Sequence, residues 1–129
     1  MKVLLVDDSP AALKIHKVLI LDACGECCVD EATSGEEGFK RFSKSWEEDD
    51  PYDVIFLDIN MPGSSGTVAL KMMRDLEKIN HLKKTFICML TGSDDETDEM
   101  LSKLNKADLY LQKAKNLKEE FAAIFERLG

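Results

Sequence analysis

The chain has 129 residues, a formal net charge of -8 at pH 7, 44% hydrophobic residues and 33% charged residues. This length predicts one domain (1–129) with a single core, and the charge argues against binding to nucleic acid or to anionic membrane surfaces. No apolar stretch reaches the roughly 18 residues of a membrane span, and no signal-peptide pattern follows Met1, so we expect a cytoplasmic protein.

Strand and helix patterns alternate regularly along the chain, which predicts βαβ units and a parallel sheet. Five short runs, mostly apolar and bounded by turn residues, have the length of strands. The expected strands cover residues 2–7, 27–32, 52–58, 85–90 and 109–112. The expected fold class is therefore α/β, with a helix after each strand.

Each expected helix has a recognisable start. Ser9-Pro10 supplies an N-cap and a first helical proline for a helix that ends near residues 22–24. The other helices are expected at 34–46, from the turn 61–66 to residue 79, from the capping box 93–96 to residue 104, and at 116–129. Their expected apolar sides contain, in chain order, Leu13, Ile15, Val18 and Leu19; Phe39 and Phe42; Val68, Met72, Leu76 and Ile79; Met100, Leu101 and Leu104; and Leu117, Phe121, Ile124, Phe125 and Leu128.

The cysteines are expected to be structural. Cys24 and Cys27 form a CxxC, but no second pair matches it, so a zinc site is not expected. A redox motif would need a helix that opens just after the pair, whereas a strand-like segment follows it here. Buried or loop thiols of this kind are compatible with a reducing cytoplasm.

Acids, a hydroxyl and a cation occupy the ends of four expected strands. Asp7 and Asp8 close the first run and Asp58 closes the third, while Thr91 and Lys113 follow the fourth and the fifth. Open α/β sheets place their ligand crevice at the carboxyl ends of their strands. Three carboxylates gathered there would repel one another by roughly 4 kcal/mol per pair at ~4 Å and an effective dielectric of ~20. A bound divalent cation is the commonest reason to tolerate that repulsion.

These residue types favour phosphoryl chemistry. Mg²⁺ takes carboxylate and phosphate oxygens as ligands, so an ion among the three acids would draw in a phosphorylated donor. Asp58 can then act as an oxygen nucleophile, as carboxylates do in aspartyl-phosphate chemistry. Lys113 would stabilise charge on the equatorial phosphoryl oxygens, and Thr91 would hydrogen-bond the new phosphoryl group.

Five ordered motifs resemble the receiver domains of bacterial two-component response regulators. They are the runs 4–9 (LLVDDS), 56–63 (FLDINMPG) and 90–92 (LTG), then Tyr110 and, three residues later, Lys113. The resemblance spans the whole chain. It implies a flavodoxin-like, doubly wound sheet of five parallel strands in the order 2-1-3-4-5, with five helices.

The resemblance also implies a partner and a cofactor. Asp58 would accept phosphate from a histidine kinase or a histidine phosphotransferase. Mg²⁺ would be held by Asp8, Asp58 and the backbone carbonyl of Asn60, with Asp7 acting mainly through water. Such a protein is a phosphorylation switch with weak intrinsic autophosphorylation and autodephosphorylation, not an enzyme in the ordinary sense.

The expected output is a change of surface. In the family, Thr91 and Tyr110 would be the switch pair and Lys113 the phosphate-sensing cation. Because phosphorylation adds nearly two negative charges, Thr91 would move toward the phosphate and vacate space for the ring of Tyr110. A downstream protein would read the face formed by the helix that ends at 104, the strand 109–112 and the last helix. Asn60 and Ser93, two residues beyond Asp58 and Thr91, are expected to tune the phosphate lifetime by steering or blocking water.

One position departs from the family pattern. Family members usually have a proline after the lysine, in a cis peptide, whereas Ala114 follows Lys113 here. A cis bond before alanine costs about 2.5–4 kcal/mol against trans. We therefore expect either a trans bond with a re-routed loop into the last helix, or a strained bond held by contacts at the phosphate site.

Other functions remain open at this stage. A phosphorelay intermediate would pass its phosphate on to a histidine of another protein. The histidines of this chain, His16 and His81, are not expected to take part in a relay, because lone histidines on helical or loop surfaces are usually solvated. An aspartyl-phosphate phosphohydrolase would need a general acid at the position of Asn60. A flavin-binding protein would need a run of Ser, Thr and Gly that cradles phosphate. No expected strand-to-helix loop offers such a run, and acids occupy the first of these loops.

Overall fold

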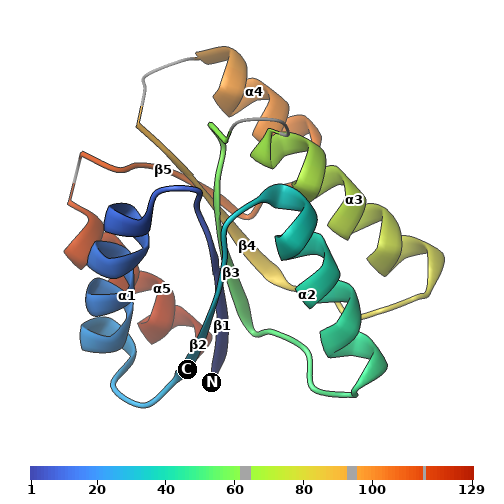
Figure 1. Cartoon of the computed structure of the whole chain (residues 1–129), viewed down its shortest axis with the longest axis horizontal. Coiled ribbons are helices and arrows are strands. Elements are labelled where there is room, and N and C mark those ends of the chain that lie inside the picture. The colour runs from blue at the N-terminus through green and yellow to red at the C-terminus, as the bar shows by residue number, and fades with distance from the viewer. Residues whose placement is uncertain (62–64, 93–95, 115) are drawn as a thin grey trace.

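The computed structural model describes residues 1–61, 65–92, 96–114 and 116–129, without the side chains of 96–98. Five parallel strands form one sheet in the order β2-β1-β3-β4-β5 (Figure 1). The strands are β1 (Lys2–Val6), β2 (Cys28–Ala32), β3 (Val54–Asp58), β4 (Phe86–Thr91) and β5 (Leu109–Gln112). The expected class, strand order and flavodoxin-like topology are confirmed, and each strand lies within two residues of its predicted bounds.

Helices cover both faces of the sheet. They are α1 (Pro10–Cys24), α2 (Gly35–Glu47), α3 (Gly66–Ile79), α4 (Glu96–Leu104) and α5 (Leu117–Leu128). In Figure 1, α1 and α5 lie on one face, while α2, α3 and α4 lie on the other. Among the described residues, no helix has the length and apolarity needed to span a bilayer.

The three central strands are apolar because both of their faces are buried. Along β1, Leu4 and Val6 join the core beneath α2 and α3, whereas Val3 and Leu5 join the core beneath α1 and α5. Side chains alternate between the two faces of a strand, so a single run of apolar residues supplies both cores.

The starts of the first two helices follow the expected chemistry. The Ser9 hydroxyl accepts a hydrogen bond from the Ala12 N–H at 3.2 Å, and Pro10 takes the first helical position. The Ser34 hydroxyl accepts from the Glu37 N–H at 3.1 Å. The predicted capping box of α4 begins at Ser93, which lies outside the described residues.

The predicted apolar sides of four helices contain errors, in every residue of α4 and in part in α1, α3 and α5, where only Leu128 of the predicted residues is exposed. In α1, the predicted Leu13 is buried and Leu19 is half-buried against the core, but Ile15 and Val18 are exposed. His16 and Ile20 complete the buried side. The prediction for His16 is therefore also wrong, since this side chain packs edge-on against Phe121 in the core. A helix that covers one face of a sheet buries only a narrow stripe, and the apolar residues beside that stripe remain in water.

The same correction applies to α3 and α4. Of the predicted side of α3, Val68, Met72 and Ile79 are exposed, while Leu76 is half-buried. The buried residues of α3 are Gly66, Thr67, Ala69, Leu70, Met73, Arg74 and Glu77. The predicted apolar residues of α4, which are Met100, Leu101 and Leu104, all face solvent.

Candidate metal centre

Three carboxylates meet at the carboxyl edge of the sheet. Asp7 and Asp8 follow β1, and Asp58 is the last residue of the neighbouring strand β3. One oxygen from each can be chosen so that all three lie within 4.8 Å of one another. Asp7 and Asp58 are buried, whereas Asp8 is exposed, so the cluster opens to solvent on the side of Asp8.

Backbone contacts hold the two buried acids in place. The Ser9 N–H donates to Asp7 Oδ1 at 3.0 Å, and the Asn60 N–H lies 3.4 Å from Asp58 Oδ1. The first contact gives Ser9 a second role that the sequence analysis missed, since only its helix cap was considered. The Asp-x-Ser spacing is the signal that could have predicted it, because aspartate side chains accept from the backbone two residues on.

Gly66 fixes the position of the loop after β3. Its N–H donates to the Ile59 carbonyl at 2.8 Å, and a Cβ at this position would lie 2.0 Å from the carbonyl oxygen of Asp58. Any side chain here would therefore push the loop away from the strand end. The start of α3 and the end of β3 are packed backbone against backbone, which sets where Asp58 sits.

Lys113 reaches the acids from the end of β5. Its ammonium lies 2.7 Å from Asp7 Oδ2 and 3.4 Å from Asp58 Oδ1. The backbone N–H of Lys113 donates to the Thr91 carbonyl at 2.7 Å, which ties the loop after β5 to β4. The bond to Ala114 is trans, the first of the two expected alternatives, since the described residues contain no cis peptide. A trans bond at this position thus still brings the ammonium to the two buried carboxylates.

The buried charges perturb one another. Burial and the nearby charge of Asp7 raise the pKa of Asp58 to about 6, although Lys113 opposes the rise. Burial favours the neutral amine of Lys113, but its hydrogen bond to Asp7 and the charge of Asp58 outweigh burial and raise its pKa. Burial, followed by the charge of Lys113, lowers the pKa of nearby His16. The centre holds more negative charge than its one lysine balances.

The remaining predicted residues lie around this centre or outside the described part. Thr91 ends β4 and is buried, with its hydroxyl 3.5 Å from the side-chain nitrogen of Asn60. Tyr110, on β5, is half-buried and packs against the core beneath α2 and α3. Ser93 lies outside the described residues.

The donor set of the centre fits a hard divalent cation. All its ligand atoms are carboxylate oxygens, and the exposed position of Asp8 leaves room for water, which Mg²⁺ retains. An added cation would offset the charge of Asp7, which together with the larger effect of burial raises the pKa of Asp58. The acidic triad is therefore of the type that binds Mg²⁺.

The fold and the centre together define a class: a doubly wound α/β protein with an acidic site at the carboxyl edge of its sheet. The response regulator receiver domain matches residues 3–125, and the chain belongs to this family. Receivers typically act as phospho-accepting signalling switches rather than as enzymes, and they partner with histidine kinases.

Three relatives show the range of the family. The chain is 31% identical over 131 residues to the chemotaxis protein CheY-3 of Vibrio cholerae, a match that covers 99% of this chain and 94% of that protein. It is 38% identical over 82 residues to hybrid signal transduction histidine kinase F of Dictyostelium discoideum, covering 64% of this chain but only 7% of the kinase. The solved structure of Vibrio cholerae CheY4 superposes with a TM-score of 0.79 at 27% identity, covering 99% of this chain and 98% of that one.

Proposed function

We propose that Asp58 of this chain accepts a phosphoryl group from a histidine kinase or a histidine phosphotransferase, and that residues 1–129 act as one receiver domain. The observation that carries the proposal is the meeting of three carboxylates within 4.8 Å with an ammonium 3.4 Å from Asp58. Of the three acids, Asp58 is the one that forms the last residue of a strand. Its carboxylate contacts both the ammonium of Lys113 and the backbone N–H of Asn60 in the loop before α3.

The transfer step follows from the chemistry of the donor. An oxygen of Asp58 attacks phosphorus in line with the leaving nitrogen of a phosphohistidine, so a P–O bond forms as the P–N bond breaks. Lys113 moves from Asp7 to a phosphoryl oxygen, because its flexible stem already reaches both acids. When bound, Mg²⁺ held by Asp7, Asp8, Asp58 and the Asn60 carbonyl would neutralise charge on the phosphoryl oxygens.

The phosphoryl group then changes the surface. It presents nearly two negative charges and three acceptor oxygens beside Thr91, whose hydroxyl would turn toward them. Tyr110, half-buried on the edge strand β5, would fill the space that Thr91 leaves. The surface of α4, β5 and α5 would differ between the two states, and a partner protein would bind one state more tightly.

Two residues would set how long the phosphate lasts. Asn60 lies two residues beyond Asp58, with its side-chain nitrogen 3.5 Å from the Thr91 hydroxyl. A side chain in that position can steer or block the water that attacks the acyl phosphate. Ser93 has the corresponding place after Thr91 in the sequence.

Intact-mass spectrometry after incubation with acetyl phosphate and Mg²⁺ tests the proposal. The wild-type chain should gain the mass of one phosphoryl group, and the gain should disappear on acid or base treatment. Asp58→Asn should gain nothing, whereas Asp75→Asn, which changes an exposed carboxylate on α3, should behave as wild type. Labelling that persists in Asp58→Asn would refute the assignment.

A phosphorelay is the second candidate function, because the chain is similar to part of a hybrid histidine kinase. The relay requires the phosphate of Asp58 to pass on to a histidine of another protein. Transfer of radiolabel from the phosphorylated chain to a purified phosphotransferase domain would support the relay. Label that leaves only as inorganic phosphate would support a terminal switch.

A further inference from the structure

A basic groove lies at the edge of the sheet opposite the metal centre. Its walls are the C-terminal half of α3, the segment that leads into β4, and the end of α4 with the loop after it. The groove encloses about 710 Å³, a size typical of ligand sites, and it is open to solvent. Figure 1 shows this end of α3 and the start of β4 far from the strand ends that carry the acids.

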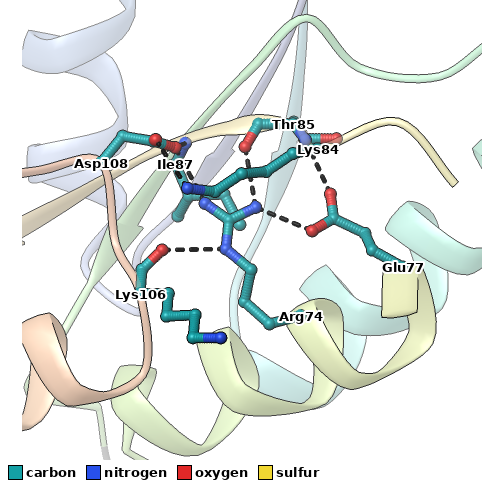
Figure 2. Close-up of polar contacts among 7 residues, drawn as sticks. All are labelled: Arg74, Glu77, Lys84, Thr85, Ile87, Lys106 and Asp108. Carbon is teal, nitrogen blue, oxygen red and sulfur yellow. Dashed lines mark hydrogen bonds and ion pairs between the residues drawn. The ribbon is translucent and has the colours of Figure 1, made fainter. Parts of the chain in front are cut away.

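A buried ion network holds the walls of the basic groove together. Arg74 of α3 donates to Glu77 Oε1, to the Thr85 carbonyl and to Asp108 Oδ2, each at 2.8 Å. Its Nε donates to the Lys106 carbonyl at 2.9 Å (Figure 2). One guanidinium therefore joins α3, the start of β4 and the loop after α4. Because this network fixes the backbone of all three walls, the groove is formed before any ligand arrives.

The basic groove carries more cations than its carboxylates balance. Arg74 is compensated by Glu77 and Asp108, and Lys84 shares that same Asp108 at 3.3 Å. Among the described residues, Lys78 and Lys106 are exposed and have no carboxylate partner. Lys78 also offsets the partial negative charge at the end of α3, but Lys84 and Lys106 lie outside both helices. This local excess of positive charge occurs in a chain whose net charge is -8.

Apolar side chains border these cations. Leu104 lines the basic groove and is 68% exposed, and Leu82 lines it from the segment before β4. Leu104 also lines an adjoining hollow together with Met100. The surface thus offers two unpaired ammonium groups beside exposed aliphatic area, which is the complement of a peptide that combines acids with an apolar residue.

We propose that the basic groove binds an acidic segment of a partner protein, with an apolar residue of that segment seated against Leu82 and Leu104. A protein segment is favoured over a nucleic acid because the rest of this acidic chain would repel a long polyanion. The described lining of the groove also contains no Phe, Tyr or Trp on which a run of bases could stack, and its one ring is that of His81. The groove is a separate surface from the acidic centre, and it shares the end of α4 with the face proposed to change on phosphorylation.

A peptide titration tests the proposal. The probe is a fluorescein-labelled peptide of glutamate and aspartate with one central leucine, and its counterpart has lysine in place of every acid. In amide NMR spectra of the wild-type chain, the acidic peptide should shift Leu82, Lys84 and Lys106. In fluorescence anisotropy, the double variant Lys78→Glu/Lys106→Glu should bind it about tenfold more weakly.

The matched control is Lys14→Glu/Lys40→Glu, which makes the same change of charge at exposed positions on α1 and α2. This variant should bind the acidic peptide within about twofold of wild type, and the lysine peptide should not bind either protein. Equal weakening in both double variants, shifts confined to other surfaces, or no saturable binding would overturn the proposal. Tighter binding of a single-stranded oligonucleotide at the same residues would also overturn it. The spectra of the wild-type chain decide the location even if a variant folds poorly.

Discussion

Asp58→Asn should stabilise the folded chain when divalent cations are absent. The buried carboxylate is held next to Asp7, and these surroundings raise its pKa from 3.8 to about 6. Each pKa unit corresponds to about 1.4 kcal/mol of difference between the two protonation states. Ionised Asp58 therefore costs up to about 3 kcal/mol of folding free energy, and an amide of the same shape removes that cost. Relaxation around the charge reduces the expected gain to about 1–3 kcal/mol.

The gain must depend on pH in a defined direction. The folded-state pKa of Asp58 lies above its unfolded value, so the folded state binds the proton more tightly. The destabilisation by the carboxylate is fully present above about pH 6 and disappears as the pH falls toward 4. The advantage of Asp58→Asn should thus be largest near pH ~8 and about half as large near pH ~5.

Urea denaturation in the presence of EDTA measures this difference. The control is Asp75→Asn, whose exposed ion pair with Lys71 should change the free energy of unfolding by no more than about 0.5 kcal/mol at either pH. The reasoning would be refuted if Asp58→Asn destabilised the chain at pH ~8, or if its effect were the same at both pH values.

Three further predictions follow from the site and its surroundings. Added Mg²⁺ should raise the urea concentration at which half of the wild-type chain is unfolded, and Asp8→Ala should remove most of that rise. An unchanged response to Mg²⁺ in Asp8→Ala would contradict the proposed ligand set. Gly66→Ala should slow phosphorylation and lower the free energy of unfolding by more than about 2 kcal/mol, because the new Cβ would clash with the Asp58 carbonyl. Gly92→Ala is the control: its Cβ would meet nothing within 4 Å, so this variant should behave as wild type in both assays. Arg74→Met should cost about 3–5 kcal/mol in a denaturant titration, since it leaves the buried Glu77 without its cation and Asp108 with Lys84 alone. A loss below about 1 kcal/mol would mean that the network does not hold α3 to β4.

The sheet and the acidic centre could be predicted from the sequence because their signals are local. Each strand is a short run with its polar residue at the end, as in the run that Asp58 closes. Since the carboxyl ends of parallel strands meet at one edge, the position of Asp7 beside Asp58 follows from topology alone. Lys113 also comes from a strand end, so the change to Ala114 after it did not disturb the prediction of its place.

The buried faces of α1, α3 and α4 and the ion network could not be predicted, because they depend on packing between distant segments, whereas the pattern did predict most of the buried face of α5. Ile15 and Val18 fit a helical apolar pattern, but the sheet covers the neighbouring stripe that includes His16. Arg74 and Asp108 are 34 residues apart in sequence, and nothing local marks them as partners. Which charged residue lies in the core is decided by the tertiary structure and not by periodicity.

Borohydride trapping of the phosphorylated chain tests the central claim most directly. Hydride reduces an acyl phosphate to an alcohol and releases inorganic phosphate, so the modified aspartate becomes homoserine and can be located by peptide mass spectrometry. After acetyl phosphate and Mg²⁺, the account predicts homoserine at position 58 and at no other carboxylate, with none formed in EDTA. Homoserine at Asp7 or Asp8, or trapping that proceeds equally well in EDTA, would contradict it.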